Sequence, residues 1–174
     1  MKSFLAIAAL VAPTSAAGEV VSSSNNAFDL RRTVELRVPP DTAFDDFAQI
    51  ARWWDDDHSY SGKSANLSLQ LRPGGCFCEA LPRGGGVEHM RVSYVAPGER
   101  LVMTGSLGPL LYEATSGVMD VRVERTSRGS RLTLNYRVAG FANGGAAKLA
   151  PLVDGVLAGQ LERYRKYAGR PRRF

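Results

Sequence analysis

The chain has 174 residues, 44% of them hydrophobic and 22% charged, and a formal net charge of +5. This suits one globular domain with a substantial core and leaves little room for two domains. Much of the positive charge lies between Arg163 and Arg173. No interleaved aromatic platform supports nucleic-acid binding by this cluster. We interpret it as solvated basic residues at a helix C-terminus, with binding to an anionic surface as the alternative.

Residues 1–17 have the pattern of a cleavable secretory signal. Lys2 precedes a short apolar run from Phe4 to Ala12, and small residues stand before a predicted cut after Ala17. The run is far shorter than the ~20 residues of a membrane span, so no integral span is expected. A short buried helix or a membrane anchor is the alternative. The mature protein is predicted to be periplasmic or secreted, with residues 18–27, rich in Ser and Asn, as a disordered lead-in.

A half-buried strand is predicted from Phe28 to Val38, where apolar and polar residues alternate. Pro39 and Pro40 end it, and a helix with Phe44, Phe47 and Trp54 on one face follows. Asp55–Asp57 stop this helix. These carboxylates could bind a metal, but apart from His58 no further ligand follows at metal-loop spacing, so we interpret them as a solvated turn and predict no metal site.

Turn residues between Asn66 and Tyr136 predict a run of six antiparallel strands. The expected hairpins set Leu69 opposite Cys78, Cys78 opposite Met90, and Cys76 opposite Val92. They also set Tyr94 opposite Leu101, Val92 opposite Met103 and Met119 opposite Tyr136. Apolar residues face each other in every pair, which assigns one inward face. A single β-bulge would reverse the assignments beyond it.

The segment from Ala146 to Ala168 is predicted to be one long helix with an apolar stripe. Its first half is apolar nearly all round, and Gly155 and Gly159 weaken it, so it needs an apolar surface to cover it. The sheet supplies that surface. The two glycines would either leave room for a ligand or allow close approach of the sheet. The expected fold is therefore α+β, a curved antiparallel sheet wrapped around a long C-terminal helix, with the domain at residues 28–168 and a basic tail at 169–174.

Three stretches of the chain, Ala51–Gly62, Leu71–Leu110 and Gly117–Gly140, resemble the START-like or SRPBCC superfamily, in the branch named after the activator of the heat-shock-90 ATPase. The Gly-Gly-x-Phe-x-Glu run at Gly74–Glu79 and the Val-x-Pro-Gly-x-x-Leu run at Val95–Leu101 are moderately specific for it. The resemblance covers residues 28–168 and implies a helix-grip fold. It also implies a deep cavity for lipids, sterols, polyketides or other apolar ligands, with occasional cyclase or dehydratase chemistry. Heat-shock partnering belongs to cytosolic relatives, a setting from which the predicted signal departs.

Candidate ligand-binding residues are those expected to face the cavity. They are Trp54, Leu69, Cys76, Cys78, Met90, Val92, Tyr94, Met103, Met119, Tyr136, Leu157 and Leu161. The apolar segment within Gly105–Ser116 is interpreted as a rim loop over an opening.

Catalytic candidates are few, because the sequence has no nucleophile-triad, phosphate-loop or zinc motif. Glu79 and His89 lie opposite each other in the predicted register, but that register points them outward as a surface ion pair. His58 could guard the cavity mouth. Cys76 and Cys78 could form a disulfide in an exported protein, but two buried thiols are the preferred interpretation.

The first hypothesis is an exported protein, a monomer or weak dimer without a cofactor, that binds a small hydrophobic ligand. The alternatives are a cyclase- or dehydratase-type enzyme that uses the same cavity, and a protein-interaction or chaperone-cofactor module.

Overall fold

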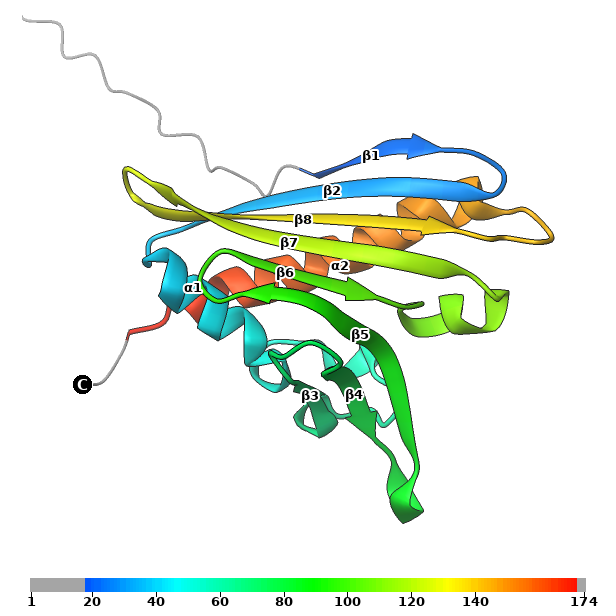
Figure 1. Ribbon diagram of the computed structural model, residues 1–174, viewed down its shortest axis with the longest axis horizontal. Coiled ribbons are helices and arrows are strands. Elements are labelled where there is room, and N and C mark those ends of the chain that lie inside the picture. The colour runs from blue at the N-terminus through cyan, green and yellow to red at the C-terminus, as the bar shows by residue number, and fades with distance from the viewer. Residues whose placement is uncertain (1–17, 172–174) are drawn as a thin grey trace, which may run out of the picture.

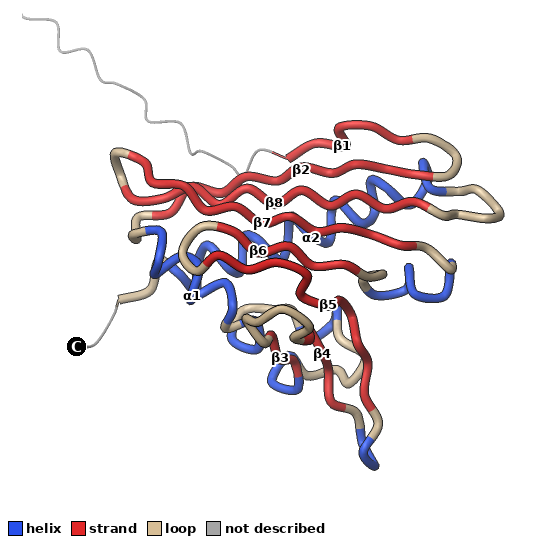
Figure 2. Tube along the Cα trace, viewed as in Figure 1, coloured by secondary structure: helices blue, strands red, loops and turns tan. Residues whose placement is uncertain are grey.

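A computed structural model of the chain describes residues 18–171. An eight-stranded antiparallel sheet has the strand order β1-β2-β8-β7-β6-β5-β4-β3, and the two α-helices lie on one face of it (Figures 1 and 2). The predicted α+β class, with a curved sheet and a long C-terminal helix, is confirmed. The predicted signal at residues 1–17 lies outside the described residues.

The strands are β1 (Gly18–Ser23), β2 (Ala27–Leu36), β3 (Leu67–Leu69), β4 (Cys76–Ala80), β5 (Gly86–Ala96), β6 (Arg100–Thr104), β7 (Ser116–Thr126) and β8 (Gly129–Ala139). The α-helices are α1 (Pro40–Ala48) and α2 (Ala146–Ala168). Short 3-10 helices are η1 (Ile50–Arg52), η2 (Asp56–His58), η3 (Ser64–Asn66), η4 (Pro82–Gly84) and η5 (Gly108–Glu113).

Strand β1 occupies part of the segment expected to be a disordered lead-in. Gly18 pairs with Arg32 and Ser23 pairs with Phe28 along the edge of β2. The Ser- and Asn-rich composition predicted disorder, but the unpaired backbone groups of a sheet edge can pair with a neighbouring segment whatever its side chains. The lead-in prediction is therefore wrong for residues 18–23.

Helix α2 has the predicted bounds and holds the sheet and α1 together. Leu157, Leu161 and Tyr164 are each no more than 1% exposed. The Tyr164 hydroxyl donates to the carbonyl of Ala43 in α1 at 2.7 Å. The helix is thus anchored in the core through its second half.

Gly155 and Gly159 lie on the exposed face of α2. A Cβ at either position would have no atom within 4 Å. Neither glycine leaves room for a ligand or lets the sheet approach closely, because both point away from the side that carries Leu157 and Leu161. Both explanations suggested by the sequence are wrong.

The β7–β8 hairpin has the predicted register, with Met119 opposite Tyr136 and Val121 opposite Leu134. The pairing of Val92 with Met103 is also confirmed.

Strand β5 departs from the prediction at two bulges. Phe77 pairs with Met90 and Cys78 with Glu88, so His89 is an extra residue in β5. A second bulge follows Val92 and sets Tyr94 opposite Val102, which leaves Tyr94 50% exposed. An extra residue shifts the alternation of side chains by one position. The predicted inward position of Tyr94 is therefore wrong.

The facing of β4 is also reversed from the prediction. Leu69 pairs with Phe77 rather than with Cys78. Phe77 and Glu79 are each 1% exposed and face the core, whereas Cys76 and Cys78 point to the other face of the strand. The predicted positions of the two cysteines in the cavity lining are therefore wrong.

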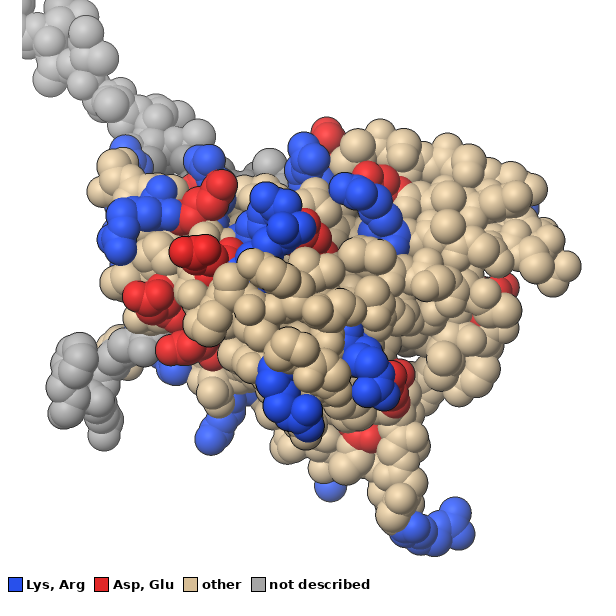
Figure 3. Space-filling model, in the orientation of Figure 1, with Lys and Arg blue, Asp and Glu red and all other residues tan. Residues whose placement is uncertain are grey.

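Opposite charges form ion pairs across the outer face of the sheet. Arg131 Nε lies 2.5 Å from Glu35 Oε1, and Arg137 Nε lies 3.2 Å from Asp29 Oδ2. Figure 3 shows positive and negative side chains intermixed over one end of this face, and few charges at the other end. The positive charges are thus largely interspersed with negative ones and do not form a single basic patch on this face.

Asp154 ties α2 to the sheet, because Arg32 Nε in β2 donates to its Oδ1 at 2.7 Å. Replacing Asp154 with Asn should lower the free energy of unfolding by about 2 kcal/mol, since it leaves a positive charge in a site where the Arg32 side chain is only 12% exposed. Urea denaturation measures the change.

The matched control is Glu162→Gln on the same helix. The Glu162 side chain is 38% exposed, and the substitution removes its ion pairs with Arg165 and Lys166. It should change the free energy of unfolding by less than about 1 kcal/mol. Equal losses in the two variants would contradict the anchoring role of Asp154.

Candidate functional site

A cavity of about 570 Å³, partly open to the surface, is bounded by the first half of α2, the segment around η2 and the segment around η5. Its apolar wall consists of Trp54, Leu107, Leu110, Leu149, Leu152, Val153, Val156 and Leu157. Polar side chains on the wall are Asp57, His58, Ser59, Tyr60, His89, Tyr112 and Glu113. The volume is in the range of small-molecule sites.

Three hydrogen bonds hold the η5 wall in place. The backbone N–H of Leu107 donates to the Tyr136 hydroxyl at 3.1 Å, and the Thr115 hydroxyl donates to the carbonyl of Leu110 at 3.0 Å. The Tyr60 hydroxyl donates to the carbonyl of Gly108 at 3.0 Å and so joins η5 to the segment after η2. Burial raises the pKa of Tyr136 to about 12, so its hydroxyl stays neutral in this contact.

Trp54 forms the floor of the cavity beside η2. Its indole N–H donates to the carbonyl of His58 at 2.8 Å, and its ring packs edge-on against Phe77 with 5.6 Å between ring centroids. The turn itself begins at Asp55, whose side chain accepts the N–H of Asp57. The acidic turn predicted from the sequence thus has a local capping role.

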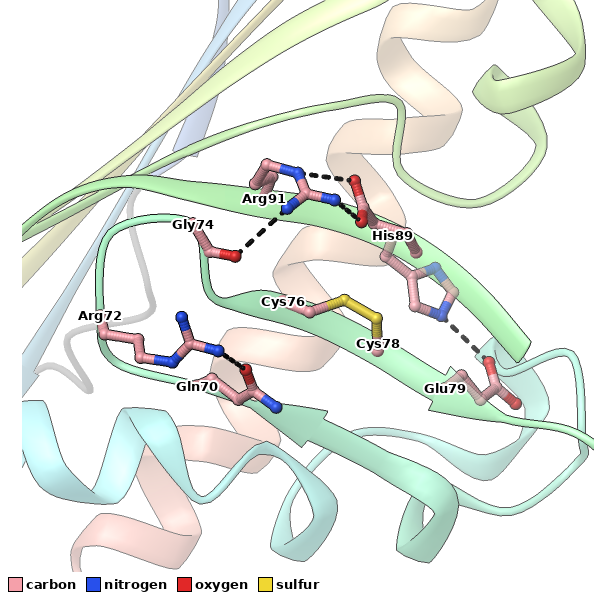
Figure 4. The surroundings of a disulfide bond; sticks show 9 residues. Gln70, Arg72, Gly74, Cys76, Cys78, Glu79, His89 and Arg91 are labelled. Atoms are coloured by element: carbon pink, nitrogen blue, oxygen red, sulfur yellow. Dashed lines mark hydrogen bonds and ion pairs between the residues drawn. A yellow bond between two sulfur atoms is a disulfide. The ribbon is translucent and has the colours of Figure 1, made fainter. Parts of the chain in front are cut away.

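Glu79 and His89 form a buried pair on the sheet side of the cavity (Figure 4). His89 Nε2 lies 3.0 Å from Glu79 Oε2, and the two residues are 4% and 1% exposed. The bulge at His89 turns this side chain inward together with that of Met90, and Glu79 faces inward from β4. The predicted surface ion pair is therefore wrong.

The Glu79 carboxylate also connects the sheet to the segment after η2. Tyr60 N–H donates to Oε2 at 3.0 Å, and Ser61 N–H donates to Oε1 at 2.5 Å. Burial raises the pKa of Glu79, but the hydrogen bonds from Ser61, Tyr60 and His89 together outweigh it and hold the pKa below its ordinary value. Glu79 is accordingly a carboxylate at neutral pH.

Burial lowers the pKa of His89, and the neighbouring Glu79 opposes this shift only in part. His89 is therefore a neutral imidazole near pH 7. A carboxylate only accepts hydrogen bonds, so the ring proton lies on Nε2 and Nδ1 carries a lone pair. Nδ1 is buried and has no hydrogen-bond partner among residues 18–171.

The predicted site residues separate into three groups. Trp54, His58, His89 and Leu157 line the cavity. Met90, Val92, Met103, Met119, Tyr136 and Leu161 are buried in the core, and Leu69 packs half-buried against it. Cys76, Cys78 and Tyr94 lie on the outer face of their strands.

The cavity lies at one end of the molecule, because the centre between sheet and helix is filled. A space of only about 10 Å³ remains among Phe77, Met103, Met119 and Leu161. Four lining residues were not predicted from the sequence, Leu149, Leu152, Val153 and Val156. The sequence feature that could have indicated them is the first half of α2, which is apolar nearly all round and so has more apolar residues than one core-facing side requires.

Cys76 and Cys78 form a disulfide along β4 (Figure 4). Their Cα atoms are 5.3 Å apart, closer than two positions along a regular strand and within disulfide reach. The prediction of two buried thiols is therefore wrong. The sulfurs and a Glu88 oxygen lie within 4.8 Å of one another, but the disulfide occupies both thiolates that a metal would need.

Comparison with known proteins establishes the fold. No family model matches the chain, and no curated protein matches its sequence. An uncharacterized protein from Rhizobium leguminosarum is 17% identical with a TM-score of 0.54, covering 87% of this chain and 96% of that chain. A protein from Chromobacterium violaceum is 15% identical with a TM-score of 0.59, covering 82% and 98%.

The di-domain aromatase/cyclase StfQ from the steffimycin biosynthetic pathway is 14% identical, with a TM-score of 0.55. The match covers 83% of this chain and 51% of that chain. At such identities these structures show that the chain has an α+β helix-grip fold, and they show the fold alone. Within residues 18–171 no helix is long and apolar enough to cross a membrane.

Acidification should destabilise the protein through the buried pair. The pKa values of His89 and Glu79 lie below their ordinary values of 6.5 and 4.5. Each group therefore stabilises the folded state when the pH is above its ordinary pKa, and this contribution is lost as the pH falls below that value. The melting temperature should therefore fall below about pH 6.5, from His89, and again below about pH 4.5, from Glu79.

The variant His89→Phe should lack the fall in melting temperature below about pH 6.5. The control is His58→Phe, at a side chain that is 42% exposed, and this variant should retain that fall. A wild-type melting temperature that is flat between pH 7.5 and 5 would contradict this pH dependence.

The disulfide should be detectable in protein purified from an oxidising compartment. Alkylation of the denatured, unreduced chain should label neither cysteine, and alkylation after reduction should label both. Mass spectrometry of the two samples measures this, and a labelled cysteine without reduction would show that the thiols are free.

Proposed function

We propose that this protein binds a small, largely apolar molecule in the cavity between α2, η2 and η5. The observation that carries the proposal is the space itself, about 570 Å³ with mostly apolar walls beside a core that is otherwise filled. Small-molecule sites in proteins are typically concave, mostly apolar spaces of this size with a few polar groups on the wall, and this cavity has both features. The aromatase/cyclase with the same fold is consistent with this use.

We further propose that the chain is a START-like protein of the branch that resembles the heat-shock-90 ATPase activator. The Gly-Gly-x-Phe-x-Glu run supports this, because each fixed residue has a physical role. A Cβ on Gly75 would lie 2.2 Å from the carbonyl oxygen of Gln70, so the turn needs glycine there. Phe77 packs in the core, and Glu79 is the buried carboxylate.

Export to the periplasm or the medium is part of the proposal. The apolar run of residues 1–17 supports it, and so does the disulfide between Cys76 and Cys78, because disulfides persist in oxidising compartments and are rare in the cytosol. The oxidised strand fits an exported ligand carrier better than a cytosolic chaperone cofactor.

An enzyme of the cyclase or dehydratase class is the second candidate. The Glu79–His89 pair favours it, because a carboxylate that orients a neutral imidazole is an arrangement suited to general-base catalysis.

A bulky residue in the cavity should abolish binding. Val156 lines the space, and Val156→Trp should fill part of it without entering the filled core. A library of apolar aromatic and lipid molecules is screened for an increase in melting temperature. A ligand at about 100 times its dissociation constant should stabilise the wild type by about 2.7 kcal/mol and the variant by much less.

The matched control is Val118→Trp on the outer face of β7, where Val118 is 43% exposed. It should retain the full ligand-induced shift. The proposal fails if no compound in the library stabilises the wild type, or if the two variants lose the shift equally.

A further inference from the structure

The unpartnered nitrogen of His89 is the one buried side-chain polar atom without a hydrogen bond among the described residues. Native proteins leave few such atoms, and each needs an explanation. His89 belongs to the cavity wall and is 4% exposed. The unpaired atom therefore belongs to a residue of the proposed ligand site and is shielded from bulk water.

The hydrogen bonds of Glu79 determine which kind of group His89 can bind. The carboxylate accepts from the backbone of Tyr60 and Ser61 and from His89 Nε2. This arrangement keeps the ring proton on Nε2 and leaves Nδ1 as an acceptor. A ligand that satisfies Nδ1 must donate a hydrogen, so a carboxylate, ether or carbonyl group cannot do so.

The surroundings of the ring restrict the ligand further. Phe77 packs against the imidazole at 4.9 Å and Tyr60 at 5.7 Å between ring centroids, so the donor approaches along apolar surface. Asp57 and Glu113 also line the cavity, and both disfavour an anion. An uncharged molecule with a hydroxyl group meets these conditions.

Access to Nδ1 requires a small movement, since the atom has less than 1 Å² exposed. Tyr60 packs on the ring, is 40% exposed, and its hydroxyl bonds to Gly108 and Tyr112 on the surface of the η5 wall. A ligand that displaces this exposed side chain would reach the face of the imidazole on which Tyr60 packs.

We propose that His89, held by Glu79, accepts a hydrogen bond through Nδ1 from the hydroxyl of an uncharged, mainly apolar ligand and thereby selects hydroxylated ligands over their ethers and carboxylates. This rests on the proposed function, because it requires that the cavity binds a ligand. It adds the chemical class of that ligand and the residue that recognises it.

The test uses three probes of similar shape, 2-naphthol, 2-methoxynaphthalene and 2-naphthoate, titrated at pH 7.5 while tryptophan fluorescence is followed, since Trp54 lines the cavity. The wild type should bind 2-naphthol about tenfold more tightly than 2-methoxynaphthalene, because only the naphthol donates to Nδ1. The naphthoate should bind most weakly.

The variant His89→Phe keeps a flat ring but lacks the nitrogen. It should bind 2-naphthol and 2-methoxynaphthalene with equal affinity, with the affinity for the ether unchanged from the wild type. The ether is thus the internal control that the cavity is intact.

A second measurement does not depend on the variant. The ¹⁵N chemical shift of His89 Nδ1 should be that of an unprotonated nitrogen in the wild type, and it should change with 2-naphthol and not with 2-methoxynaphthalene.

The outcomes separate the two proposals. Equal binding of the naphthol and the ether by the wild type, or an Nδ1 that is protonated at pH 7.5, overturns the role of His89 while ligand binding stands. Loss of both affinities in His89→Phe, with the fold intact, also overturns it. Failure of all three probes to bind the wild type counts against both proposals.

Discussion

The buried carboxylate of Glu79 is the contact on which the arrangement of the site depends. A charge inside a protein must be paired, and Glu79 is paired by Tyr60, Ser61 and His89. The two backbone donors come from the segment after η2, and His89 comes from β5. One side chain therefore fixes a cavity wall to the sheet and sets the orientation of the imidazole. Without it, the segment after η2 would lose these bonds to the sheet, and the tautomer of His89 would not be determined.

Helix α2 has two functions that divide along its length. Its second half buries Leu157, Leu161 and Tyr164 against the sheet and α1. In its first half, Leu149 and Val153 line the cavity. Asp154 stands between the halves and pairs with Arg32 of β2. The first half is anchored as well, because Ala146 and Ala150 are fully buried, so only one side of it borders the cavity.

The cavity wall combines apolar and polar side chains, and this lining says more about function than the fold does. Helix-grip structures with low identity to this chain include an aromatase/cyclase and uncharacterized proteins, so the fold alone assigns no activity. Here a mostly apolar wall carries a few polar side chains, among them the buried imidazole of His89 that Glu79 orients. Such a site can distinguish ligands by a single hydroxyl group, and the same acceptor is placed to act as a base if the protein is an enzyme.

Side-chain period and turn length were enough to predict several elements of this fold. The bounds of α2, the strand after Phe28 and the pairing of Met119 with Tyr136 came from periodicity and short loops, which act locally. The bulges at His89 and after Val92 have no such local signal, and each reverses the facing of its neighbours. Long-range contacts therefore set the burial of Glu79 and His89, the outward-facing disulfide of Cys76 and Cys78, and the position of the cavity at one end of α2.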